Sequence, residues 1–295
     1  MSNKQNNIIA EDWDEFTHTT HANSLSNEEI FKNFGAFRAR IKGLPKDELV
    51  ERGWIKGDDY STIYRLFFSL VGLQEKVLFR KSTAIDDTLL TIWMSLVKDE
   101  ANLVRVERQI PSFEALSKED LRAIAKLSID VNAIKKLPEI LAEKGVILVY
   151  CRALSGMKLD GATFKLKSGQ IVVGMSIRFS RLDYFWFTLM HELAHVVLLK
   201  GEFEGALIFD LEECDLDVHE KAANKLAKES LVDRTTWRNC EPKYQSGETA
   251  VRKYASKEGV HPSIVAGLLR KELNDYSRYS KIINEHDVRS IIFER

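Results

Sequence analysis

The sequence predicts an α+β fold: a small, mostly antiparallel sheet leads into a long buried helix, and additional N- and C-terminal helices flank this core. Three observations carry the prediction. Short runs rich in β-branched residues, at 146–150 and 170–178, indicate buried strands. The segment 185–199 is almost wholly apolar, which is typical of a helix covered on every side. Elsewhere, apolar residues recur every three or four positions, as they do in amphipathic helices.

The composition is that of a folded globular protein. The chain has 295 residues and a mass of 33.8 kDa, with 44% hydrophobic and 29% charged residues. Its formal net charge of −1 supplies no overall positive field, so we do not expect direct DNA binding. There is no signal-peptide pattern and no apolar run of 18 residues, which predicts a cytoplasmic protein without a membrane partner.

Three widely spaced cysteines, Cys151, Cys214 and Cys240, form no CxxC pair. Their odd number and spacing argue against both a disulfide framework and a thiolate zinc site. We therefore expect three reduced thiols.

The first 110 residues divide into a tail and a helical region, and neither shows visible chemistry. Residues 1–24 lack periodicity and predict a mobile tail, in which His18 and His21 are better explained as a disordered pair than as a metal site. Residues 25–110 predict a helical N-terminal region. Its expected helices cover 26–43, 45–53, 58–72 and 86–107, and the last has Leu89, Ile92, Trp93, Leu96 and Leu103 on its inward side.

Residues 111–235 predict the core. Pro111 marks its start, and helices are expected at 117–127 and 131–144. The strands follow, with the middle one at 161–166 joined to the last by a Ser-Gly turn. An edge strand of such a sheet could bind an extended peptide through its main chain.

The long buried helix carries His191, Glu192 and His195 in an HExxH motif. The two histidines are one helical turn apart, so both imidazoles leave the same face and can reach one metal ion. Zinc suits this motif, because two imidazoles and a third protein ligand leave one tetrahedral position for water. Glu192 is then the expected general base, which takes the proton of that water and passes it to the leaving amine.

A chance match is the alternative explanation, since HExxH is a short motif. The apolar flanks argue against it, because two histidines and a glutamate inside a buried helix need polar or metal partners.

The third ligand is expected from a later helix that begins near His219. Glu220 shares one helical stripe with Ala223, Ala227 and Leu231, so this carboxylate lies on a packed face and needs a counter-charge. Glu220 is therefore the preferred ligand; His219 and the acidic residues of 202–217 are the alternatives. Asn224, one turn later, is either a support for the site or a packed polar residue.

Residues 236–295 predict a C-terminal helical region. Helices at 248–257 and 262–273 are joined by a short turn, which makes a DNA-binding helix-turn-helix conceivable. The basic residues there are matched by acids, and His261 precedes a proline at a helix start, which is a structural position. We therefore expect no DNA reader in this region and a packed tail over 280–295.

Together these residues resemble the ImmA/IrrE family of bacterial metallopeptidases, a zincin-like group. The likeness covers about residues 145–231, through Gly-Met-Ser-Ile-Arg at 174–178, Asp183, the stretch 185–195 and the Glu-Lys-Ala-Ala-Asn-Lys-Leu-Ala segment from Glu220. Weaker likeness continues at 259–267 and at 44–93, which is similar to a linker of longer members.

The resemblance implies a zincin-like core that binds Zn2+ through His191, His195 and Glu220, with Glu192 as base. It also implies a typical substrate, a helix-turn-helix repressor that is cut to switch on a stress, mobile-element or defence operon. Longer members carry their own N-terminal helix-turn-helix, whereas residues 1–43 hold one predicted helix and cannot supply such a domain. The alternative is a non-proteolytic regulatory or antitoxin component that uses the same fold to bind a protein. Glu192 favours the peptidase, because a purely structural zinc site needs no base.

Overall fold

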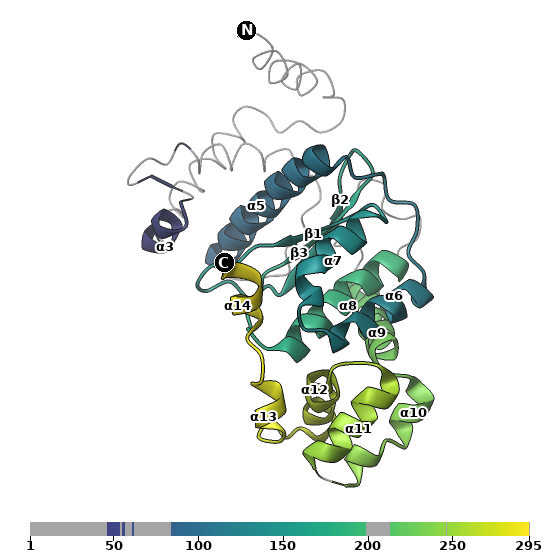
Figure 1. Ribbon diagram of the computed structural model, residues 1–295. Helices are drawn as coiled ribbons and strands as arrows, with labels where there is room; N and C mark the ends of the chain where they lie inside the picture. Colours follow the sequence, from purple (N-terminus) through teal and green to yellow (C-terminus); the bar gives the residue numbers. More distant parts are fainter. Residues whose placement is uncertain are drawn as a thin grey trace.

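The computed structural model describes residues 46–53, 55–56, 61, 84–198, 213–245 and 247–294. The predicted tail 1–24, the predicted helix 26–43 and the acidic residues 202–212 lie outside this part, as does all of the predicted helix 58–72 except one residue. Within it the predicted α+β class is confirmed, because helices surround one sheet of three strands (Figure 1).

The sheet contains β1 (Val146–Tyr150), β2 (Gly161–Lys165) and β3 (Ile171–Met175) in the order β1-β3-β2. β2 and β3 form the predicted antiparallel hairpin, whereas β1 runs parallel to β3. The expectation of a mostly antiparallel sheet is therefore wrong for the β1–β3 pair. The burial of the strands accounts for this order: every residue of β3 is buried, so β3 takes the centre, while the polar Thr163 and the exposed Lys165 suit β2 to an edge.

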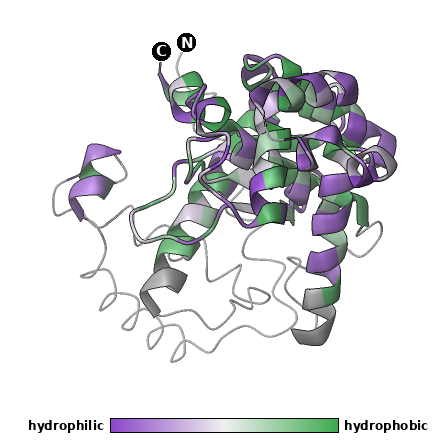
Figure 2. Ribbon diagram, turned by 90° about the horizontal axis from the view of Figure 1, so that it is seen from below, coloured by the Kyte–Doolittle hydropathy of each residue, from purple (hydrophilic) through white to green (hydrophobic). Residues whose placement is uncertain are grey.

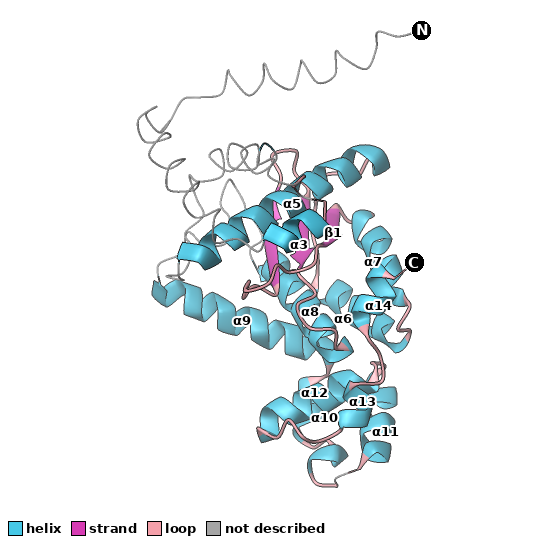
Figure 3. Ribbon diagram, turned by 90° about the vertical axis from the view of Figure 1, so that its left-hand side faces the viewer, coloured by secondary structure: helices cyan, strands magenta, loops and turns pink. Residues whose placement is uncertain are grey.

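One face of the sheet is covered by α5 (Ala84–Arg108), which lies across the strands (Figure 3). Trp93 and Val97 of this helix approach β3 at Gly174, where an added Cβ would lie 2.9 Å from each side chain. Only glycine permits that contact. The predicted boundary between the helical region 25–110 and the core 111–235 thus lies between α5 and the sheet that this helix covers.

The stripe of α5 that faces this cluster continues through the buried Val97 and Ala101 and the partly buried Val104. Leu103 lies beside this stripe and is 59% exposed, so its predicted inward position is wrong. The short helix α3 (Lys46–Glu51) joins the same apolar cluster through Leu49.

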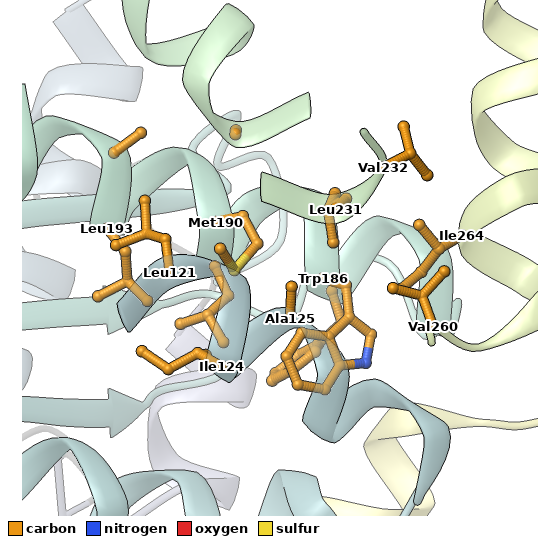
Figure 4. Close-up of a cluster of buried hydrophobic side chains, with 14 of the residues drawn as sticks. Leu121, Ile124, Ala125, Trp186, Met190, Leu193, Leu231, Val232, Val260 and Ile264 are labelled. Atoms are coloured by element: carbon orange, nitrogen blue, oxygen red, sulfur yellow. The ribbon is translucent and has the colours of Figure 1, made fainter. Parts of the chain in front are cut away.

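The opposite face of the sheet packs against α7 (Ala133–Ala142) and α8 (Leu182–Leu198). Figure 4 shows the core behind α8, where side chains of α6 (Lys118–Lys126), the end of α9 (Glu213–Leu231) and α12 (Pro262–Leu273) meet. Trp186 of α8 lies between these helices and is fully buried. Helices on several sides and a sheet on another explain why α8 is so apolar.

The C-terminal helices gather at the end of the molecule away from the sheet (Figure 1). They are α10 (Arg234–Arg238), α11 (Glu248–Glu258), α12 and α13 (Ser280–Ile283). A 3-10 turn at Glu241–Lys243 lies between α10 and α11, and another at Leu127–Ile129 follows α6. The last helix, α14 (Val288–Phe293), returns to the core beside α7.

Hydrophilic and hydrophobic residues alternate along most helices in Figure 2, as expected where only one side of a helix enters a core. None of the helices described here is both long and apolar enough to cross a membrane.

Candidate metal centre

Helix α8 brings His191 and His195 together on one side. Their rings are nearly perpendicular, at 88°, with centroids 4.6 Å apart. The two Nε2 atoms are 3.0 Å apart. The i, i+4 spacing of a regular helix therefore directs both nitrogens to a common point, as the motif predicts.

Glu220 of α9 faces the same point. Its Oε2 lies 3.3 Å from Nε2 of His191, and its Oε1 lies 3.4 Å from Nε2 of His195. Helix α9 lies along α8, and the buried small residues Ala223 and Ala227 allow this close approach. The helix begins at Glu213, earlier than expected, so Glu220 lies in its second turn.

These separations fit a metal site. Two ligands at tetrahedral angles, each about 2.0–2.2 Å from a zinc ion, are themselves about 3.3 Å apart. The three observed separations run from 3.0 to 3.4 Å. His191, His195 and Glu220 therefore form a group that could hold a metal ion.

The group is open on one side. The side chain of His195 is only 6% exposed, whereas those of His191 and Glu220 are 23% and 38% exposed. A water molecule or a substrate can thus approach from the side of Glu220 while the core holds His195 in place.

Electrostatics within the group favour a charged carboxylate. Hydrogen bonds from His191 and His195 hold the pKa of Glu220 well below its usual range. Burial lowers the pKa of His191, but the hydrogen bond to Glu220 and the charges of Glu192 and Glu220 outweigh it, so this pKa is raised. The site thus concentrates negative charge where a cation would bind.

The side chain of Glu192 lies against β2. It is 8% exposed, and its Oε2 accepts a hydrogen bond of 2.7 Å from Oγ1 of Thr163. Burial raises the pKa of Glu192, and the charges of His191 and His195 oppose this rise. The carboxylate is therefore more basic than an exposed glutamate and lies next to the two imidazoles.

Gly161 makes room for this carboxylate. A Cβ at position 161 would lie 2.7 Å from Oε1 of Glu192, closer than side chains tolerate. Gly161 and Thr163 share one face of β2, and the buried Ala162 and Phe164 occupy the other. Neither residue was predicted to belong to the site. The period-two alternation of β2 places both on one face of the strand, but nothing in the sequence specifies which helix that face meets.

Of the alternative ligands, only His219 can be compared with the group, because the side chains of the acidic residues 202–217 lie outside the described part. His219 lies outside the group. Asn224 is exposed rather than packed, and its side chain adds a hydrogen bond that raises the pKa of His191. It therefore supports the site from the edge.

The described cysteines are free thiols. Burial raises the pKa of Cys151 to about 12, and burial also raises that of Cys240. Both thiols are therefore protonated at neutral pH and are poor metal ligands.

Comparison with protein-family models finds no match for this chain, and a search among curated proteins finds none either. The likeness to the ImmA/IrrE family therefore depends on the motif residues themselves. What the structure shows is a His-His-Glu group with a buried carboxylate beside it, an arrangement that fits a metallohydrolase.

Proposed function

We propose that this protein is a zinc-dependent endopeptidase that binds Zn2+ through His191, His195 and Glu220 and uses Glu192 as general base. The observation that carries the proposal is the position of Glu192, buried beside a group of three ligands. Structural zinc sites have four protein ligands, whereas catalytic sites have three and an open position. A buried carboxylate next to such a group serves catalysis better than it serves stability.

Each group of the site has a separate role in the proposed reaction. A bound zinc ion would lower the pKa of a coordinated water to about 7 and polarise a carbonyl. Glu192 accepts the proton of the attacking water and then donates it to the leaving amine. Thr163 occupies Oε2 of Glu192 and thereby fixes the orientation of the carboxylate, and Gly161 leaves the space that this orientation needs.

Strand β2 supports a peptide as the substrate. In the described residues it pairs only with β3, so its outer edge carries unpaired main-chain groups. The same strand touches Glu192 through Gly161 and Thr163. An extended peptide on this edge would place its main chain beside the base, with little dependence on sequence.

For the substrate we propose a separate, small helix-turn-helix repressor, in keeping with the ImmA/IrrE resemblance. The chain has a net charge of −1, so a transcriptional effect requires a second protein that holds the DNA. The cut would fall in an extended, exposed segment, because packed segments must first unfold locally.

The test is to incubate the zinc-loaded protein with the product of a neighbouring repressor gene and to follow intact mass. We expect one cut, which a chelator prevents and which Glu192→Gln abolishes while its zinc content is unchanged. Glu139→Gln is the matched control, since that carboxylate is exposed on α7. Cleavage that persists in Glu192→Gln would contradict Glu192 as the base, and an uncut repressor that is nevertheless bound tightly would favour the non-proteolytic binding module instead.

A further inference from the structure

Hydrogen bonds join the segment that contains β2 to α8 at two places. At one, Oγ1 of Thr163 donates to Oε2 of Glu192, the candidate base. At the other, the hydroxyl of Tyr184, in the first turn of α8, donates to Oδ2 of Asp160, at 2.5 Å. Asp160 directly precedes β2, so the start and the middle of this short strand are both tied to the helix that carries the two histidines.

The two hydrogen bonds have similar spacing along the strand and along the helix. Asp160 and Thr163 are three residues apart, which corresponds to about 10 Å of extended chain. Tyr184 and Glu192 are eight residues apart, which corresponds to about 12 Å of α-helix. The contacts follow the same order along both elements, so the Tyr184–Asp160 bond fixes how far β2 lies along α8.

The position of β2 matters for the base because the strand touches it closely. Gly161 lies between the two hydrogen bonds, and a Cβ there would lie 2.7 Å from Oε1 of Glu192. Thr163 lies 2.7 Å from the other carboxylate oxygen, Oε2. A displacement of β2 by about 1 Å would take this second contact out of hydrogen-bond range.

Arg178 holds Asp160 from the opposite side. Its Nε and Nη2 donate to Oδ1 and Oδ2 of Asp160, at 2.7 and 3.1 Å. The two side chains are 31% and 30% exposed, where a single ion pair contributes little, but a bidentate pair has a defined geometry. Burial and the hydrogen bond to Asp160 raise the pKa of Tyr184 to about 12, so its hydroxyl is a donor at neutral pH. Asp160 is therefore held between β3's continuation and α8.

The backbone next to Arg178 has an unusual conformation. Ile177 has φ +46, which is rare for a β-branched residue. Arg289 of α14 donates through Nε to the carbonyl of Ile177, at 3.0 Å, and through Nη2 to that of Arg178. Strain of this kind persists only where surrounding contacts enforce it. The backbone conformation from which Arg178 reaches Asp160 is thus held by a separate helix.

We infer that Tyr184 and Arg178 are positioning residues for the candidate base. Through Asp160 they set where β2 lies along α8, and this position brings the hydroxyl of Thr163 to the carboxylate of Glu192. The inference rests on the proposed peptidase function and extends its machinery to the first turn of α8. A contact that served only folding would affect the rate independently of Thr163, which provides the test.

The first experiment is a double-mutant cycle, read from single-turnover cleavage of the helix-turn-helix repressor with the protein in excess. Tyr184→Phe removes the hydroxyl at nearly unchanged shape and should slow cleavage about fivefold, at unchanged zinc content. In a Thr163→Val background the bond to be positioned is absent, so Tyr184→Phe should slow cleavage by no more than about twofold. Equal losses in both backgrounds, or no loss in either, would overturn the positioning role.

The matched control is Tyr254→Phe, which removes a hydroxyl 3.1 Å from Oγ1 of Thr236 in the C-terminal region and should leave the rate unchanged. Arg178 is tested by a conservative pair of variants. Arg178→Ala removes both bonds to Asp160 and should slow cleavage about as much as Tyr184→Phe, whereas Arg178→Lys retains a charged donor and should restore part of the rate. An Arg178→Ala variant as fast as the wild type, or an Arg178→Lys variant as slow as Arg178→Ala, would contradict the role of Arg178.

The second experiment does not depend on catalysis. Threonine methyl groups are isotopically labelled in the zinc-loaded protein, and the Thr163 resonance, identified by its loss in Thr163→Val, is followed by NMR. We expect Tyr184→Phe and Arg178→Ala to shift this resonance and Tyr254→Phe to leave it in place. A shift in a protein that cuts no repressor would contradict the peptidase and support the contact between β2 and α8; an unshifted resonance in a cleaving enzyme would contradict the positioning role alone.

Discussion

Among the described residues, two pairs of histidine rings lie next to each other, and the pairs differ in what their ring nitrogens face. His191 and His195 have Nε2 atoms 3.0 Å apart, with Glu220 opposite both. His261 and His286 have ring centroids 5.3 Å apart, but Nδ1 of His261 accepts a hydrogen bond from the backbone N–H of Ser263. The first pair could hold a metal ion together with Glu220, and His261 of the second pair caps α12.

The pKa values of the two pairs move in opposite directions. Although burial lowers it, the pKa of His191 is raised overall by its hydrogen bond to Glu220 and by the nearby carboxylates. Burial and the neighbouring His286 lower the pKa of His261 to about 4. Proximity of two histidines therefore does not make a metal site; convergent nitrogens with a carboxylate do.

The largest effect should come from removing a histidine of the first pair. His191→Ala or His195→Ala leaves two ligands, and we expect the purified variants to lose nearly all of about one zinc per chain. His261→Ala and His286→Ala are the matched controls and should keep it. Metal analysis by mass spectrometry measures the zinc content of each variant, and a full zinc content in His191→Ala would contradict the assignment of His191 as a ligand.

The next effect separates the two candidates for the third ligand. Glu220→Ala should weaken zinc binding by about 100-fold or more, beyond the 10- to 100-fold typical of groups that only support ligands. His219→Ala, its sequence neighbour, should leave the affinity unchanged. Competition with a chromogenic chelator measures both, and the reverse result would make His219 the ligand.

A smaller effect is expected at Thr163, whose hydroxyl holds the carboxylate of Glu192. Thr163→Val removes the donor at similar size and should reduce turnover about tenfold, with zinc content unchanged. Thr163→Ser keeps the hydroxyl and should restore most of the rate. Equal rates in the two variants would show that the hydrogen bond does not set the turnover, and a slower Thr163→Ser would assign the effect to the methyl group.

The smallest effect concerns pH and the second pair. The pKa of His261 is about 4 in the folded protein against 6.5 for a free histidine, so the unfolded chain binds more protons between these values. Stability is therefore lost as the pH falls through this window, by about 2 kcal/mol between pH 7 and pH 5.

His261→Asn retains a helix-capping acceptor that does not titrate, so its stability should fall less over that range. His286, Glu285 and Arg252 act electrostatically on His261 and stay in place. Urea unfolding of both proteins at the two pH values provides the measurement. Parallel losses in the variant and the wild type would assign the pH dependence to other groups.

Local patterns were enough to predict part of this structure. The run 146–150 and the helix 262–273 were predicted at their observed bounds, because β-branched residues, capping residues and prolines act over a few positions. The packed stripe through Glu220, Ala223 and Ala227 indicated which of many carboxylates is the third metal ligand. The structure brings that carboxylate to the two histidines.

Local patterns of this kind do not predict contacts between segments that are distant in the sequence. Nothing local to β1 specifies that it pairs in parallel with β3 rather than with β2. Thr163 is an ordinary strand residue until α8 lies against it, and Gly161 is an ordinary glycine until Glu192 needs its space. Leu103 shows the same limit, because a helical stripe turns gradually and a regular period places residues at its margin wrongly.

The contact between α14 and the segment that precedes α8 also has a consequence in time: Arg289 donates through Nε to the carbonyl of Ile177, at 3.0 Å. The two residues are 112 positions apart in the chain. At about 5–20 residues per second on the ribosome, roughly 6 to 22 seconds separate their synthesis. Early in that interval the residues of α8 and Glu220 are synthesised, while Ile177 still lacks this hydrogen bond. A newborn chain can therefore contain all three candidate metal ligands before the segment that precedes α8 receives its contact with α14, so this segment is the last part beside the site to be completed.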